Sequence, residues 1–284
     1  MGMYLLKTTV IAAGLALAAS SAAVAGEDAK LVINGELTIP TRAKAPAYLE
    51  NMDEIVSGWV YRTKETQALE MDDFDNPAFV FVDIALDMWE EVDGSKGKSC
   101  ASCHTNGPEE FAGLTATMPR VDKDGNLETL TAVVNRMRTE LMGADAWKYS
   151  GGEMSAMTAL IGLQSRGMKV NVAVDGAAAP YWERGKELYY TRVGQLDIAC
   201  SNCHEDNYGV MIRADHLSQG QTNGFPTYRL KNAKINTVQG RFKGCMKNIR
   251  ATPYKEGGDE FNALELYVAS RGNGLTVETP SVRN

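Results

Sequence analysis

The chain has 284 residues, of which 29 are Lys or Arg, 36 are Asp or Glu and 3 are His, so its net charge at pH 7 is −7. An acidic balance argues against nucleic acids and anionic lipids as partners, because basic surfaces recognise both. The length suits one large domain or two small ones. Five cysteines are present, and their spacing carries most of the remaining information.

The first 25 residues have the pattern of a secretory signal peptide. Lys7 provides the positive charge, 9–19 is an apolar run, and Ala23-Val24-Ala25 is a cleavage motif. The apolar run is too short for a good membrane span, and no later stretch approaches the required length of about twenty apolar residues. We therefore expect an exported chain that begins near Gly26 and has no membrane span.

The next segment, 26–75, has few apolar runs and is interrupted by prolines and charges. We expect it to be an N-terminal extension, poor in strands, that wraps the first domain. Beyond it, apolar residues at helical spacing predict four helices. Two of these helices end in Ser-Arg-Gly, which is a normal stop signal. The predicted helices are 76–91, 153–167, 181–190 and 260–272.

A Cys-x-x-Cys-His motif occurs twice, one hundred residues apart, as Cys100-Ala101-Ser102-Cys103-His104 and Cys200-Ser201-Asn202-Cys203-His204. This motif is the attachment signature of c-type haem, in which two thiols bind the porphyrin covalently and the histidine binds the iron. Zinc or dithiol chemistry is the alternative, but three histidines and one remaining cysteine supply zinc ligands poorly. The motifs therefore predict two covalently bound haem c groups, held by Cys100, Cys103, Cys200 and Cys203, with His104 and His204 as axial ligands.

The helices and motifs together form two copies of one helix–motif–loop–helix unit, joined by a linker at 169–180. Small and then large residues precede each motif at matching positions, a pattern that suits the helix crossing beside the haem in cytochrome c folds. They are Ala85, Met88 and Trp89 in the first copy and Gly185, Leu188 and Tyr189 in the second.

The predicted fold class is therefore mainly α, with two cytochrome c-like haem domains in tandem. Residues 26–172 contain the extension and the first domain, and 173–284 contain the second domain. Export agrees with this prediction, because c-type haem is attached outside the bacterial cytoplasm. The expected compartment is the periplasm.

Each haem iron also needs a distal ligand or an open site. Cys245 follows His204 by 41 residues and lies in 229–255, which contains eight Lys or Arg and no Asp or Glu. A solvated basic face is the ordinary interpretation of such a run. A basic pocket that holds a thiolate beside a haem is the alternative, because positive neighbours lower a thiol's pKa and attract anions. His216 is a competitor for the same iron.

At these residues the chain resembles the SoxA family, the dihaem subunits of SoxAX cytochromes in bacterial sulfur oxidation. The resemblance covers nearly the whole mature chain and rests on the paired motifs, on 239–245, on Ile249-Arg250-Ala251-Thr252-Pro253 and on the Ser-Arg-Gly helix ends. It implies that Cys245 is both an axial ligand of the active-site haem and the carrier of a persulfide. It also implies that Arg241 lines the substrate site.

The reaction implied by this resemblance is that of an L-cysteine S-thiosulfotransferase. Thiosulfate is joined oxidatively to a cysteine of a SoxYZ-like carrier protein, and two electrons leave through haem to a SoxX-like monohaem cytochrome and then to another cytochrome c. Because thiosulfate is a dianion, Arg241 and Lys243 can bind and orient it near Cys245. Lys247 and Arg250 add to the positive field.

The first haem site departs from the common pattern of the family. Many relatives have a cysteine as distal ligand in an Asn-x-Cys-Arg context, whereas this chain has Asn135-Arg136-Met137-Arg138. A thioether also binds haem iron, and His/Met ligation raises the reduction potential relative to thiolate. We therefore expect His104 and Met137 to hold the first haem. Met142 and Met118 are alternative ligands, and a methionine packed in the core is the ordinary alternative.

Two other functions remain open at this point. A thiosulfate dehydrogenase similar to TsdA also uses a cysteine-ligated haem, but it makes tetrathionate and needs no carrier protein. A plain dihaem electron-transfer cytochrome would use Cys245 as a ligand alone, and the basic run would dock an acidic redox partner. A dihaem peroxidase fits less well, because it needs a site open to peroxide.

Overall fold

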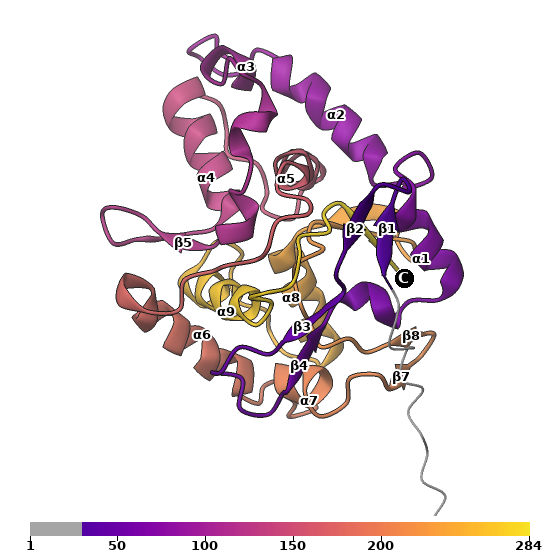
Figure 1. The fold of residues 1–284 in the computed structure, drawn as a ribbon. Coiled ribbons are helices and arrows are strands. Elements are labelled where there is room, and N and C mark those ends of the chain that lie inside the picture. The colour runs from indigo at the N-terminus through magenta and orange to yellow at the C-terminus, as the bar shows by residue number, and fades with distance from the viewer. Residues whose placement is uncertain (1–29) are drawn as a thin grey trace, which may run out of the picture.

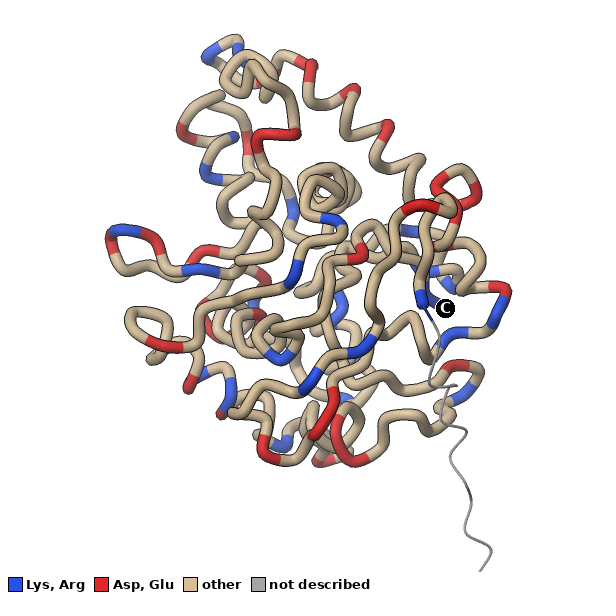
Figure 2. Tube along the Cα trace, in the orientation of Figure 1, with Lys and Arg blue, Asp and Glu red and all other residues tan. Residues whose placement is uncertain are grey.

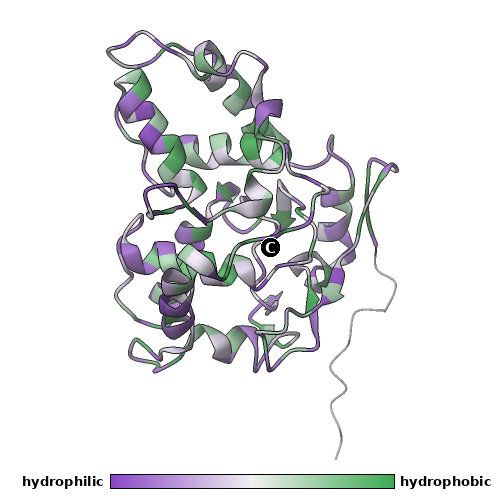
Figure 3. Cartoon of the chain, turned by 60° about the vertical axis from the view of Figure 1, so that its left-hand side comes forward, coloured by the Kyte–Doolittle hydropathy of each residue, from purple (hydrophilic) through white to green (hydrophobic). Residues whose placement is uncertain are grey.

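The computed structural model describes residues 30–284, so the predicted signal peptide lies outside the described residues. Two groups of helices, one from each half of the chain, stack on each other in Figures 1 and 3. None of the described helices is both long enough and apolar enough to cross a membrane. All four predicted helices are present: α2 (Phe79–Glu90), α5 (Gly152–Leu163), α6 (Ala179–Tyr190) and α9 (Asp259–Ser270).

The first group packs α2 against α5. Val82, Ala85 and Trp89 are the buried residues of α2, and their spacing places them on one face of the helix. Acidic residues follow the exposed side of the same helix in Figure 2. The group is completed by α3 (Cys100–Cys103), two 3-10 helices (Pro108–Phe111 and Thr115–Thr117), the β5–β6 hairpin (Arg120–Val121 and Leu127–Glu128), α4 (Leu130–Arg136) and a π-helical turn (Met137–Met142).

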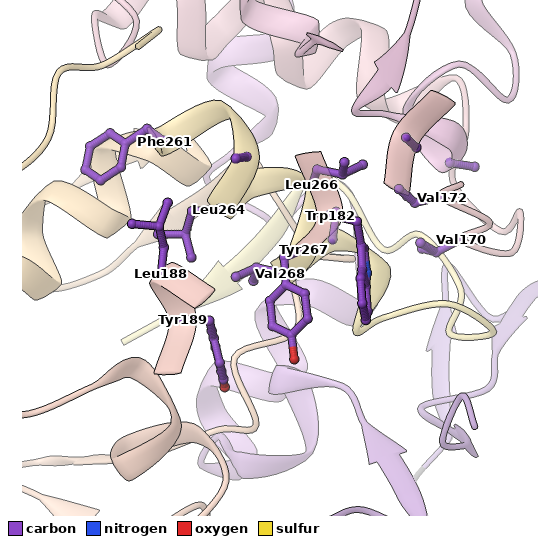
Figure 4. Packing of buried hydrophobic residues seen from close by; sticks show 14 of the residues in the cluster. Val170, Val172, Trp182, Leu188, Tyr189, Phe261, Leu264, Leu266, Tyr267 and Val268 are labelled. Carbon is purple, nitrogen blue, oxygen red and sulfur yellow. The ribbon is translucent and has the colours of Figure 1, made fainter. Parts of the chain in front are cut away.

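The second group packs α6 against α9 around a core of aromatic and aliphatic side chains (Figure 4). Gly185 lies where the two helices approach most closely. A Cβ atom at this position would lie 2.1 Å from the carbonyl oxygen of Ala263 and 2.7 Å from Cβ of Tyr267. The small residue predicted for the helix crossing is therefore required by the backbone approach. This group also contains a 3-10 turn (Gly176–Ala178), α7 (Cys200–His204), the β7–β8 hairpin (Met211–Ile212 and Asp215–His216) and α8 (Val238–Asn248).

The N-terminal extension corrects one prediction. It contains four short strands and a helix, and it packs against the second half as well as the first. The hydroxyl of Tyr48 donates to the Ser270 carbonyl at 2.8 Å, and the amide of Val56 donates to Gln219 at 2.7 Å. Three-residue strands are too short to show alternation, so the pattern missed them. They are β1 (Leu31–Ile33), β2 (Leu37–Ile39), β3 (Arg42–Lys44) and β4 (Glu54–Val56), followed by a 3-10 turn (Gly58–Tyr61) and α1 (Lys64–Met71).

The C-terminal segment ties the halves together. The linker at 169–180 is held by it, because the amide of Val170 donates to the Leu275 carbonyl at 2.8 Å and the amide of Gly274 donates to the Val170 carbonyl at 2.9 Å. The last strand pairs in parallel with the central strand of a small sheet, whose other edge strand leads into α8. This three-stranded sheet has the order β10 (Lys234–Asn236), β9 (Thr227–Arg229) and β11 (Ser281–Arg283).

Candidate functional site

The second motif forms α7, and its histidine has a fixed orientation. Nδ1 of His204 donates to the Ser218 carbonyl at 2.7 Å, and the ring also forms a side-chain hydrogen bond with Cys245. Gly220 lets the ring pack closely, because a Cβ atom there would lie 2.9 Å from Cγ of His204. The adjacent Glu205 forms a buried ion pair with Arg271, whose guanidinium lies 4.5 Å from the ring centre of Tyr189. The motif is thereby anchored to the end of α9.

Cys245 lies on α8, and the structure brings it to His204. The helix begins at the N-cap Thr237, whose hydroxyl accepts from the amide of Gly240 at 3.3 Å. Arg241 precedes Cys245 by four residues, so both side chains lie on the same face of the helix. Cys245 is half-buried.

The electrostatic surroundings of Cys245 favour the thiolate. Burial opposes ionisation of the thiol, but the charge of Arg241, the hydrogen bond and charge of His204 and the charge of Arg229 outweigh this effect and lower its pKa from 9.0 to about 7. At Cys200 the balance is reversed, because burial and the neighbouring Cys245 and Cys203 raise the pKa of that thiol to about 12. Cys245 is therefore the thiol suited to act as a nucleophile near neutral pH.

Arg229 is a site residue that the sequence analysis missed. It lies at the end of β9, twelve residues before Arg241, and its charge acts on both Arg241 and Cys245. Arg62 from the extension adds to the same field and donates to the His216 carbonyl at 2.7 Å. The only sequence signal for Arg229 was its position at the start of the basic run. Its approach to α8 depends on how the chain turns after β9, and that turn has no recognisable sequence pattern.

The other predicted basic residues contribute less to this site. Nζ of Lys243 forms an ion pair with Oε2 of Glu256 at 2.7 Å, and the residue lies two positions from Cys245, on a different face of α8. Lys247 and Arg250 are exposed. His216, the competing ligand, lies on β8 and is absent from the charges that act most on the Cys245 thiol.

In the first half, His104 is held differently from His204. Its Nδ1 lies 3.1 Å from Oε2 of Glu110, and its ring packs against Phe111 and Trp89 with ring centres 4.8 and 5.7 Å away. Cys103 is exposed and Cys100 is partly buried, as expected for thiols on one turn of a short helix.

Met137 occupies the position in the first half that Cys245 occupies in the second. Thr129 is the N-cap of α4 and accepts from the amide of Ala132 at 3.2 Å, just as Thr237 caps α8. Both Met137 and Cys245 follow their cap by eight residues. This equivalence could not be read from the sequence, because the two segments share little beyond the threonine.

The two alternative methionines lie elsewhere in the first half. Met118 lines a cavity between the two halves, where Leu130 is also found. Met142 is 4% exposed and lies at the end of the π-helical turn, where its carbonyl accepts from the amide of Lys96 at 3.0 Å. Of the three methionines, Met137 alone has the position that matches Cys245.

Comparison with known proteins agrees with this duplicated geometry. The family described as SoxA/TsdA, cytochrome c domain, matches residues 85–170 and 184–277, one segment in each half. The chain belongs to this family. The prediction of a mainly helical fold with two cytochrome c-like units is confirmed by this match and by the helices of the structure.

Relatives of the SoxA type match the chain almost end to end. The SoxA subunit of the L-cysteine S-thiosulfotransferase of Paracoccus pantotrophus is 56% identical over 98% of both chains, and that of Rhodovulum sulfidophilum is 56% identical over 93% of both chains. A crystal structure of SoxXA from P. pantotrophus has a TM-score of 0.88 and 57% identity, and covers 91% of this chain and 99% of its own. The resemblance to the SoxA family is thus confirmed.

Membership in the SoxA/TsdA cytochrome c family implies bound haem c, and the donor set of the second half suits it. Cys200 and Cys203 lie on one helical turn, His204 follows them, and Cys245 is hydrogen-bonded to the histidine ring. Thiol pairs, imidazole and thiolate are the ligand types that c-type haem uses. Among residues 30–284, no cluster of three or more His, Cys, Asp or Glu forms a separate metal site.

Proposed function

We propose that this chain is the SoxA-type subunit of an L-cysteine S-thiosulfotransferase of the periplasm, in which thiosulfate is joined oxidatively to a cysteine of a SoxYZ-like carrier protein. The observation that carries the proposal is the placement of Cys245, with its lowered pKa and partial exposure, between His204 and a pair of arginines. The match of the chain to SoxA relatives over nearly its full length supports the same activity.

The proposed chemistry begins with binding of the thiosulfate dianion. Arg241 and Arg229 present planar guanidinium groups to its oxygens, which orient the outer sulfur toward Cys245. The Cys245 thiolate forms a sulfur–sulfur bond, of the persulfide type, to the outer sulfur of thiosulfate as two electrons are lost. The carrier cysteine then attacks that outer sulfur, takes the whole thiosulfate group and releases the Cys245 thiolate. The net conversion forms one sulfur–sulfur bond between thiosulfate and the carrier thiol, and it releases the thiol proton and two electrons.

We propose two covalently bound haem c groups. Cys200 and Cys203 would hold the second haem, with His204 and Cys245 as its axial ligands, and Cys100 and Cys103 would hold the first, with His104 and Met137. When bound, haem c supplies acceptor chemistry for the electrons released. The equivalent positions of Met137 and Cys245 on capped helices support this ligand set.

The proposed partners follow from the same function. The solved relative is a SoxXA complex, which supports a SoxX-like monohaem cytochrome as a bound subunit. A SoxYZ-like carrier would deliver the accepting cysteine, and another cytochrome c would receive the electrons. A TsdA-like thiosulfate dehydrogenase is the second candidate, because the matching family contains both types.

The test is thiosulfate-dependent reduction of cytochrome c by the purified protein with its SoxX-like and carrier partners. Wild type and Cys245→Ala are compared after mass spectrometry has shown two haems in each. We expect carrier-dependent turnover in the wild type and none in the variant, because the variant lacks the sulfur that carries the substrate.

Other outcomes would assign the protein differently. Tetrathionate formed without a carrier would identify a thiosulfate dehydrogenase. An inactive wild type with both haems and all partners present would identify an electron-transfer cytochrome. A wild type with a single haem would refute the dihaem proposal itself.

A further inference from the structure

The two motif histidines have different hydrogen-bond partners, although the motifs and the helices before them repeat. His204 donates through Nδ1 to a neutral backbone carbonyl, that of Ser218, at 2.7 Å. His104 has the carboxylate of Glu110 at 3.1 Å in the same place. The partner of a ligating histidine sets the basicity of the ring, and a carboxylate raises it more than a carbonyl does.

The Glu110 carboxylate is positioned by a short 3-10 helix that follows the first motif, and the second motif is followed by a hairpin instead. Gly107 has a positive φ of 80° and precedes the 3-10 helix Pro108–Phe111, which carries Glu110. The other oxygen of Glu110, Oε1, accepts from the amide of Asn106 at 3.0 Å, so the side chain bridges the backbone and the imidazole. Phe111, on the same short helix, packs against the His104 ring with a centre distance of 4.8 Å.

The corresponding loop of the second half follows another path. After His204 the chain forms the β7–β8 hairpin and returns as backbone at Ser218, so no side chain reaches Nδ1. The contrast is therefore built by different loops and does not follow from the motif itself.

We propose that Glu110 makes His104 a more basic axial ligand than His204 and thereby lowers the reduction potential of the first haem. The proposal rests on the haem assignment made above. A more basic histidine donates more electron density and stabilises the oxidised iron, which opposes the rise in potential caused by a thioether ligand. Glu110 thus acts as a positioning residue for His104. Its effect opposes the higher reduction potential expected from Met137, which stands where many relatives have a cysteine.

The test is redox titration of each haem in the complete, haem-loaded protein. Glu110→Gln removes the charge from the hydrogen bond and should raise the midpoint potential of the first haem. We expect the ratio of reduced to oxidised first haem at a fixed ambient potential to rise about tenfold, which is about 59 mV for one electron. The second haem, in the same sample, should keep its potential.

Two further variants separate the hydrogen bond from simple charge. Glu109→Gln removes the same charge one residue away and should change the ratio by less than about twofold, because the hydrogen bond to His104 comes from Glu110 and an exposed charge without that bond is screened. Glu110→Asp keeps the charge, but its shorter side chain moves the carboxylate away from the His104 ring. It should therefore also raise the midpoint potential of the first haem. It also provides the test if Glu110→Gln fails to retain its haem.

The electron paramagnetic resonance spectrum of the oxidised first haem gives a second measurement, because a change in the basicity of an axial imidazole changes the g values. Equal shifts in Glu110→Gln and Glu109→Gln, or no shift in either, would overturn the proposal. These outcomes leave the haem count unchanged, so they are distinguishable from a failure of the dihaem assignment, which mass spectrometry reports.

Discussion

Arginine, rather than lysine, dominates the positive field at Cys245. Arg241 lies one helical turn from Cys245, and Arg229 acts on the same thiol from β9. Lys243, in contrast, forms an ion pair with Glu256. A guanidinium offers a planar pair of donors to an oxyanion, and it stays charged when half-buried. The site therefore suits an anion with several oxygens on one face, such as thiosulfate.

Substitution of these residues should give graded effects on kcat/KM for thiosulfate. We expect Arg241→Gln to lower it about a hundredfold and Arg229→Gln about tenfold, because each removes a charge-assisted contact to the dianion. Lys243→Gln is the control and should stay within about twofold, since Lys243 is paired with Glu256 and lies on another face of α8. Steady-state kinetics with the carrier provide the measurement. An effect of Lys243→Gln as large as that of Arg229→Gln would contradict this assignment.

Residue spacing predicted the motif residues, because covalent haem attachment demands a fixed local pattern. Cys245 was predicted from its distance to His204 and from the basic run, and Arg241 from the resemblance to the SoxA family. The structure places Arg241 and Cys245 on one helix face, and their roles stay predictions. Lys243 was chosen for its nearness in sequence, and the helical period takes it to another face. Arg229 could not be found in this way, because its contact with α8 depends on how β9 folds back.

At the scale of elements, the crossing of α6 and α9 is the most constrained contact. Gly185→Ala should lower the free energy of unfolding by about 2–3 kcal/mol, because the added methyl group overlaps the backbone of Ala263. Urea unfolding of the haem-loaded protein measures this. Gly152→Ala is the matched control, because no atom lies within 4 Å of a Cβ atom there. Equal stability of Gly185→Ala and wild type would show that the crossing can relax.

Helices were predictable because their apolar residues recur over three turns or more. The strands of the extension and those of the sheet around β9 have three residues each and show no period. The Ser-Arg-Gly motif predicted where two helices end, but it did not predict which residues its arginine contacts. Arg271 is buried against Glu205, whereas Arg166 pairs with Asp73 of the extension at 2.6 Å, so one motif makes two different contacts.

At the scale of the whole molecule, a cavity of about 80 Å³ lies between the two halves and is lined by Glu265 of α9. Burial raises the pKa of the Glu265 carboxyl from 4.5 to about 7, although a hydrogen bond from Gln239 opposes the rise. The folded state thus binds this proton more tightly than the unfolded chain. Its contribution to stability is complete below about pH 4.5 and is lost as the pH rises through about 7.

Glu265→Gln should flatten the pH dependence of the unfolding free energy. We expect the difference between wild type and variant to change by at most about 1.4 kcal/mol per pH unit from pH 4.5 to 7, and to be constant above that range. Urea unfolding at a series of pH values gives the measurement, with the exposed Glu183→Gln as control. A constant difference across the whole range would refute the raised pKa.

The division of the chain at residue 172 stays a prediction. The linker is hydrogen-bonded to the C-terminal segment, and the extension contacts both halves. Such long-range contacts connect residues that are distant in sequence, so neither composition nor periodicity can reveal them. The two cytochrome c-like units were predictable, because their motifs and helices repeat locally.

The π-helical turn at Met137–Met142 records a change in chain length. The amide of Ser95 donates to the Gly143 carbonyl, and the amide of Gln195 donates to the Arg250 carbonyl, so the two turns are equivalent. However, Gly143 follows its helix cap by fourteen residues, whereas Arg250 follows its own cap by thirteen. One additional residue in an α-helix would rotate everything beyond it by about 100°. The wider turn absorbs that residue after Met137, so the distance from helix cap to Met137 equals that from cap to Cys245, and the loops beyond still meet the same turns although the two halves differ in length by one residue.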